Sequence, residues 1–172
     1  NVSSGATAGH RINATILTNA NIVTTSAASG QGISETLTTA TSTSTIIVGT
    51  LSVTGISQVA STTQIGTRNI TVIRFNFTAT GEQMNITGLN ITLNGTQTVG
   101  DIDRVGLYNG TGGYDLIQWN TSAPVSGRYN FSNIGFNVSV GTNVLLVIIN
   151  LTDTAIGGHT FNVSIEGAAD VV

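Results

Sequence analysis

The residues of this sequence that could undergo chemistry are asparagines placed two positions before a serine or threonine. Thirteen of the 17 asparagines begin such an Asn-x-Ser/Thr triplet, with x never proline. Serine and threonine make up 44 of the 172 residues, so random placement would give roughly four triplets. In an exported chain the triplet directs attachment of a glycan to the asparagine amide nitrogen. The expected acceptors are Asn1, Asn13, Asn69, Asn76, Asn85, Asn90, Asn94, Asn109, Asn120, Asn130, Asn137, Asn150 and Asn162.

Two interpretations of this density remain open. Threonine-rich strands with asparagine on their polar face produce such triplets by composition alone. The other interpretation is an N-glycosylated outer surface, which requires export of the chain. The chain begins at Asn1 without a preceding apolar segment, and we therefore expect a mature extracellular protein whose signal has been removed.

No other residues of the sequence combine into a catalytic or metal-binding pattern. His10 and His159 lie far apart in the chain, cysteine is absent, and there is no Gly-x-Ser-x-Gly motif or phosphate loop. Asp101 and Asp103 could offer hard oxygen ligands to Ca²⁺, but two spaced carboxylates in a loop are more often solvated. We expect a protein that is not an enzyme, with no metal and no cofactor apart from covalent glycans.

The composition narrows the choice of partners. Charged residues are 8% of the chain, lysine is absent, and the five arginines are scattered singly. A nucleic-acid-binding face needs clustered basic residues, so we expect no nucleic-acid partner. The longest apolar run, VLLVII at 144–149, is far too short to span a bilayer. Without disulfides, stability must come from the core or from assembly.

The elements that would position these residues are short strands. From about residue 46 onward, β-branched runs alternate with Gly, Asn and Ser, and no helix of ordinary length fits. This pattern predicts an all-β fold, an antiparallel β-sandwich of about eight strands occupying 46–172. The strand candidates are TIIVGTLSVTG, NITVIRFNFTA, MNITGLNITLNG, DRVGLYN, YDLIQWN, YNFSNIGFNVSV, NVLLVIINLT and HTFNVSIEG.

Alternation within the runs assigns side chains to faces. Successive strand residues point to opposite sides of a sheet, and the acceptor asparagines repeatedly take the parity opposite to the apolar residues. The residues expected to face the core are Ile73, Phe75, Phe77, Leu89, Ile91, Leu93, Phe136, Val138, Val140, Phe161, Val163 and Ile165. The run 143–151 is apolar on both parities, which predicts a central strand and, we expect, one wall of a groove that receives another strand.

The first 45 residues differ from the rest. They are rich in Thr, Ser, Ala and Gly, but 12–24 alternates strictly and predicts a β-strand with one apolar face, followed by a flexible linker. This strand either folds back into its own domain or leaves to complete a neighbouring subunit, as in donor-strand complementation. The inward-facing residues of the donor would be Ile12, Ala14, Ile16, Thr18, Ala20 and Ile22.

The aromatic residues allow a further alternative. Trp119 lies near Tyr108, Tyr114 and Tyr129 in the sequence, and exposed rings in this region could stack on sugars as in a carbohydrate-binding module. A tryptophan buried between two sheets is the commoner arrangement.

Over residues 12–167 the chain resembles archaeal thread and bundling-pilus subunits, which are related in architecture to TasA-type biofilm fibres. The resemblance rests on GTLSVTG, the long run from GTRNITVIRFNFTATG to DRVGLYNGTGG, and the closing VLLVIINLTDTAIGGHTFNVSIEG, together with the strand-like tail and the dense triplets. It implies an extracellular, heavily N-glycosylated homopolymeric filament at the cell surface. Each β-sandwich head would receive the N-terminal strand of the next subunit, with a role in adhesion and biofilms. The alternative is a self-contained S-layer or adhesin domain.

Overall fold

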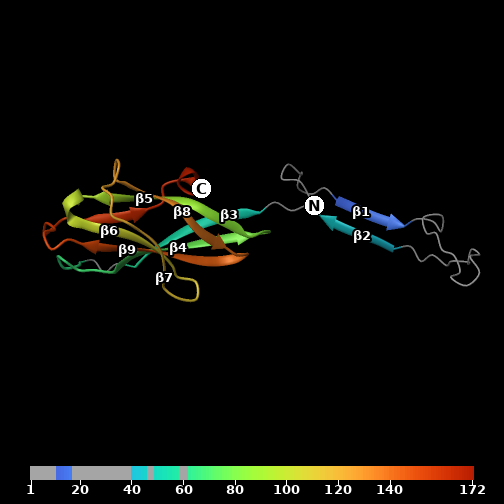
Figure 1. Ribbon diagram of the computed structural model, residues 1–172, viewed down its shortest axis with the longest axis horizontal. Coiled ribbons are helices and arrows are strands. Elements are labelled where there is room, and N and C mark those ends of the chain that lie inside the picture. Colours follow the sequence, from blue (N-terminus) through green and yellow to red (C-terminus); the bar gives the residue numbers. More distant parts are fainter. Residues whose placement is uncertain (1–10, 17–39, 46–48, 59–61) are drawn as a thin grey trace, which may run out of the picture. The chain divides into compact units, whose positions relative to one another are not determined.

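The computed structural model describes residues 11–16, 40–45, 49–58 and 62–172 of the chain (Figure 1). The chain divides into two compact units, Asn1–Val48 and Gly49–Val172. In the first unit, β1 (Arg11–Ile16) pairs antiparallel with β2 (Ala40–Thr45), and these two strands form a sheet of their own.

The second unit consists of two antiparallel sheets. The larger has the strand order β3-β4-β9-β6-β7 and the smaller has the order β10-β5-β8. Each run that was predicted to be a strand overlaps one of these strands, so the prediction of an all-β fold with antiparallel sheets is confirmed. The bounds are β3 (Thr50–Ser57), β4 (Ile70–Thr80), β5 (Met84–Gly95), β6 (Ile102–Asn109), β7 (Asp115–Asn120), β8 (Arg128–Val138), β9 (Gly141–Leu151) and β10 (Phe161–Ser164), with the 3-10 turns η2 (Val99–Asp101) and η3 (Ala168–Asp170).

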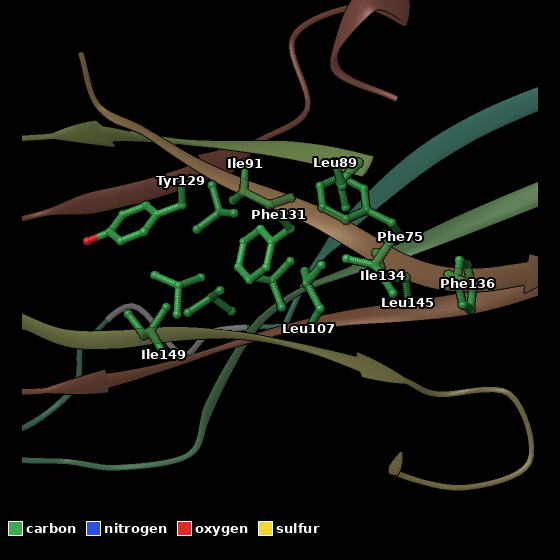
Figure 2. Packing of buried hydrophobic residues seen from close by; sticks show 14 of the residues in the cluster. Phe75, Leu89, Ile91, Leu107, Tyr129, Phe131, Ile134, Phe136, Leu145 and Ile149 are labelled. Atoms are coloured by element: carbon green, nitrogen blue, oxygen red, sulfur yellow. The ribbon is translucent and has the colours of Figure 1, made fainter. Parts of the chain in front are cut away.

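The two sheets share one hydrophobic core (Figure 2). Leu89, Ile91 and Leu93 of β5 are all at most 4% exposed, as their common parity predicts. Phe77 of the larger sheet meets Phe136 of the smaller one edge to face, with ring centroids 5.6 Å apart. Burial of each such side chain contributes about 1.5–3 kcal/mol, which is what holds the two layers together.

Strand β8 changes parity halfway along its length. Phe131 is buried in its first half and Phe136 in its second, because the ladder with β5 shifts register between them. Asn133 and Gly135 take positive φ values of 55° and 57°, conformations that these two residue types adopt more readily than most. Val140 was predicted to face the core and is instead 63% exposed, because it lies beyond the end of β8.

Strand β9 is the central strand of the larger sheet, as predicted. Leu145, Val147 and Ile149 are fully buried in the core, and Leu146 and Ile148 on the other face are only 5% and 6% exposed. The prediction that this strand forms one wall of an open groove is wrong, since β4 and β6 occupy both of its edges.

Candidate functional site

An open seam runs between the edge strand of each sheet, β3 on one side and β10 on the other. No described strand pairs with the outer edge of β3 or of β10. A hollow of about 540 Å³ lies at one end of the seam, between Ile73 and Phe161, and another of about 400 Å³ lies between Val53 and Ile165. Strand β10 is much shorter than its neighbour in the sheet: it spans only Phe161–Ser164, whereas β5 spans Met84–Gly95.

The walls of this seam are incompletely covered; the smaller hollow is mainly apolar, whereas polar and apolar residues contribute about equally to the larger one. Most of the half-buried hydrophobic residues that pack against the core lie here, whereas the core residues themselves are enclosed. These seam residues are Leu51, Val53, Ile73, Phe161, Ile165 and Val171. Apolar side chains along an unpaired strand edge are the features that an added β-strand recognises.

On the opposite side of the same unit, hollows of about 400 and 390 Å³ lie beside the loop that joins the two sheets. Strands β7 and β8 are the edge strands there, and the chain passes directly from one to the other. The side chain of Asn120 at the end of β7 donates a hydrogen bond from Nδ2 to the backbone oxygen of Asn130 in β8, at 2.8 Å. The loop 121–127 and this hydrogen bond therefore bridge the two sheets on this side.

The predicted donor strand is only partly described. Strand β1 covers its first part, including Ile12, Ala14 and Ile16, and neither sheet of the second unit includes it. Thr18, Ala20 and Ile22 lie outside the described residues, as does Asn1 among the predicted acceptors. Asn13 is placed in β1.

Most of the predicted acceptor asparagines in the second unit lie on strands or turns with exposed or half-buried side chains. Asn69, Asn85, Asn94, Asn130, Asn137 and Asn162 are exposed, and Asn76, Asn90, Asn109 and Asn120 are half-buried. On β5 their neighbours of opposite parity fill the core, which leaves the asparagines on the outer face.

Asn150 is the exception, and the structure argues against its prediction as an acceptor. Its side chain is fully buried on the second face of β9. Its Oδ1 accepts a hydrogen bond from the backbone N–H of Asn69 at 2.6 Å, and its Nδ2 has no hydrogen-bond partner. A glycan on this nitrogen would have no space in the folded chain. The role of Asn150 is instead to position Asn69, which has a positive φ of 56°.

The most constrained carboxylate is Asp101, and sequence reasoning did not find its partners. Its side chain accepts hydrogen bonds from the Thr98 backbone at 2.6 Å and the Ile156 backbone at 2.7 Å, and it lies 2.7 Å from His159 Nδ1. The bond from the Thr98 backbone, followed by those from His159 and Ile156, holds the pKa of Asp101 well below its ordinary value. The cluster ties η2 to the loop before β10.

Asp101 and Asp103, the two carboxylates considered as calcium ligands, interact with different groups. Asp101 is enclosed by hydrogen-bond donors, whereas the more exposed Asp103 lies 3.3 Å from Arg68 and 3.8 Å from Arg104. The described residues contain no group of three or more acidic, histidine or cysteine side chains placed to hold a metal ion.

A second charged cluster lies where the C-terminal segment meets the smaller sheet. Arg128 of β8 pairs with Glu166 at 2.9 Å and with the buried Asp170 of η3 at 3.2 Å. The Glu166 carboxylate also accepts a bond from Asn94 at 3.3 Å. The hydrogen bond from Arg128, and then that from Asn94, lowers the pKa of Glu166. This cluster anchors the C-terminal segment to β5 and β8.

Trp119 does not lie between the sheets. It pairs across the ladder with Gly106, and its indole ring packs closely over that glycine on the outer face of the larger sheet. Tyr108 meets the ring edge to face at 5.6 Å, and the Arg104 guanidinium carbon lies 4.3 Å from the ring centroid. Tyr129, by contrast, is 4% exposed in the core, so the aromatic residues do not gather into one flat strip.

Comparison with known proteins gives no family assignment. No protein-family model matches the chain, and no curated protein matches it significantly. Across the part of the chain that is described, no helix is long and apolar enough to cross a membrane.

Proposed function

We propose that the chain is a structural subunit of an extracellular archaeal surface filament. In this proposal residues 49–172 form a β-sandwich head, and the N-terminal strand of one subunit lies in the seam between β3 and β10 of the next. The observation that carries the proposal is this seam, where half-buried apolar residues from both sheets border two unpaired strand edges. A role in adhesion and biofilm formation follows from a filament at the cell surface.

The donor strand is suited to such an exchange. Strand β1 pairs only with β2 among the described strands, and an isolated two-stranded ladder is at best marginally stable in water. In the seam, the same strand would gain main-chain hydrogen bonds to a free edge and would bury its alternating isoleucines, at about 1.5–3 kcal/mol each. Because each subunit donates to the next and the operation does not close, the product is a filament.

Glycans would complete the surface of this filament. With charged residues at 8% of the chain, electrostatic repulsion between filaments is weak. The exposed acceptor asparagines lie on the face of the strands opposite to the core, where attached sugars would separate neighbouring filaments without disturbing the packing. Enzymatic removal of the glycans should therefore cause lateral clumping, which light scattering would detect; unchanged dispersal would contradict this function of the sugars.

Two complementary variants test strand donation. Ile16→Asp places a charge on the apolar parity of the donor, and Val53→Asp places one in the seam. Each variant alone should remain monomeric, whereas an equimolar mixture should form one-to-one dimers, because one variant keeps a working seam and the other a working donor. Thr15→Asp and Thr54→Asp, on the opposite parities of the same strands, are the matched controls and should still polymerise.

Light scattering coupled to size-exclusion chromatography would measure these masses, and circular dichroism would verify that each head remains folded. Filaments formed by Ile16→Asp, or monomers in the mixture of two folded variants, would contradict the proposal. If Val53→Asp unfolds the head, Ile165→Asp tests the other wall of the seam.

A specific observation supports the alternative of a self-contained S-layer or adhesin domain. Strand β1 pairs with β2 of its own chain through a continuous register from Arg11 opposite Thr45 to Ile16 opposite Ala40. If this ladder persists in solution, the strand stays with its own subunit. The alternative therefore predicts a stable monomer of the unmodified chain.

A further inference from the structure

The acceptor asparagines of the smaller sheet stand opposite one another in pairs. In the ladder between β5 and β8, Asn85 faces Asn137 and Asn90 faces Asn130. In the ladder between β10 and β5, Asn162 faces Asn94. Every acceptor asparagine within these three strands is therefore a member of a cross-strand pair.

The two side chains of each pair lie on the same face of the sheet. Asn85 and Asn137 are exposed while the adjacent Ile86 and Phe136 are buried, and Ile86 and Phe136 are themselves opposite each other. Directly opposite residues of an antiparallel pair have Cβ atoms about 4.5–5.5 Å apart. The side chains that carry the two amide nitrogens of a pair are therefore attached to the backbone only about one strand spacing apart.

The pair in the middle of the ladder shows how close the amides come. Asn130 Nδ2 donates a hydrogen bond to Asn90 Oδ1 at 2.8 Å. A third acceptor, Asn120, donates from its own Nδ2 to the Asn130 backbone oxygen, also at 2.8 Å. Glycosylation replaces one of the two N–H groups of an amide, so a modified Asn130 keeps one N–H for its bond to Asn90.

This spacing conflicts with two sugars on one pair. A pyranose ring with its hydroxyl groups is wider than one strand spacing, roughly 4.8 Å, so a first glycan covers the facing asparagine as well. If modification follows folding, the first glycan blocks access of the transferase to the second amide. If modification precedes folding, two glycans would be forced together as the strands pair.

We propose that each of the three asparagine pairs carries one glycan, so that the smaller sheet holds three glycans rather than six. The covalent step is attack of Nδ2 on C1 of a phosphate-linked sugar donor. The Nδ2–C1 bond forms, the C1–O bond to phosphate breaks, the phosphate carrier leaves with the electron pair, and one amide proton is released. This inference rests on the glycosylated surface of the proposed function and not on strand donation.

In the pair Asn90 and Asn130, the solvent exposure of the two side chains indicates which asparagine carries the glycan. Asn130 is exposed, whereas Asn90 is half-buried and already accepts the bond from Asn130. The glycan of this pair is therefore on Asn130, and Asn90 orients its amide.

Intact mass spectrometry of the full-length protein from its glycosylating host tests the count. The double variant Asn85→Gln with Asn137→Gln should lose the mass of one glycan relative to the wild type. The matched double variants at Asn94 with Asn162, and at Asn90 with Asn130, should each lose the same mass. Glutamine keeps an amide on the outer face but cannot act as the acceptor.

Loss of two glycans from any double variant would overturn the inference, and so would loss of none. A wild-type mass equal to that of the bare polypeptide would refute the glycosylated surface as well, whereas a loss of two glycans would refute the inference alone. Circular dichroism of each variant would exclude misfolding as the cause of a changed count.

Discussion

Replacing Asn150 by aspartate tests the claim that this triplet is structural and not an acceptor. The change exchanges the unpartnered Nδ2 for an oxygen and leaves an acceptor in place for the backbone N–H of Asn69. The new carboxyl group would be in a fully buried position, opposite Arg104 in the ladder between β6 and β9. Burial disfavours an ionised carboxylate and raises its pKa, whereas the Arg104 cation opposes this rise in part, because its guanidinium is already packed on the Trp119 ring.

The size of the effect is limited by protonation. The introduced carboxyl group can take up a proton on folding instead of remaining charged. At pH 7, the free energy of protonating a group with an unfolded pKa of about 3.9 is about 4 kcal/mol, because each pH unit above the pKa costs about 1.36 kcal/mol. Because Arg104 offsets part of this penalty, we expect a loss of about 2–4 kcal/mol at pH 7, against a total stability of about 5–15 kcal/mol for an ordinary domain. Because the folded pKa is raised, the loss should shrink as pH falls and be small near pH 4.

Urea denaturation of the full chain at several pH values between 4 and 7 would measure this loss against the wild type at each pH. Asn133→Asp is the control, since Asn133 is exposed, begins no acceptor triplet, and has a positive φ that aspartate also adopts; its effect should stay within about 0.5 kcal/mol. The glycan mass of Asn150→Asp should equal that of the wild type. A variant as stable as the wild type at pH 7, a loss independent of pH, or a missing glycan would refute the reasoning.

Three further predictions concern the polar clusters and one close packing contact. The folded pKa of Asp101 lies below its ordinary value of 3.8, so the stability that this carboxylate contributes is present above about pH 4 and is lost on acidification. Asp101→Asn should therefore be less stable than the wild type at pH 7. A difference in urea midpoint between the two proteins that does not narrow below pH 4 would contradict this. Arg128→Ala should lower the thermal midpoint and detach the C-terminal segment, because it removes the cation beside the buried Asp170; unchanged hydrogen exchange of that segment would count against it. Gly106→Ala places a carbon 2.6 Å from the Trp119 ring and should cost about 1–3 kcal/mol, so an unchanged urea midpoint would show that the ring moves freely.

The strands and their faces could be predicted from the sequence because alternation is a local property. Leu89, Ile91 and Leu93 share one parity, and all three are buried. The register between strands is not local. That Asn85 faces Asn137 depends on the irregularity between β5 and β8, where Asn133 adopts a positive φ, and no parity rule specifies such a position.

The site was only partly predictable for the same reason. The contact between Asp101 and His159 joins residues 58 positions apart, and neither residue has a distinctive sequence context. The burial of Asn150 did have a signal. It shares its parity with Leu146 and Ile148, and a strand that is apolar on both faces leaves no open face for a glycan. The seam between β3 and β10 could not be located from the sequence, because its position depends on which strands form the edges of the two sheets.

Electron microscopy of the native protein sheared from cells tests strand donation most directly. The proposal predicts thin unbranched filaments with a repeat of one head, in which density for residues 12–24 crosses into the next head and lies between β3 and β10. Isolated particles, a two-dimensional lattice, or filaments in which this segment stays with its own head would contradict it.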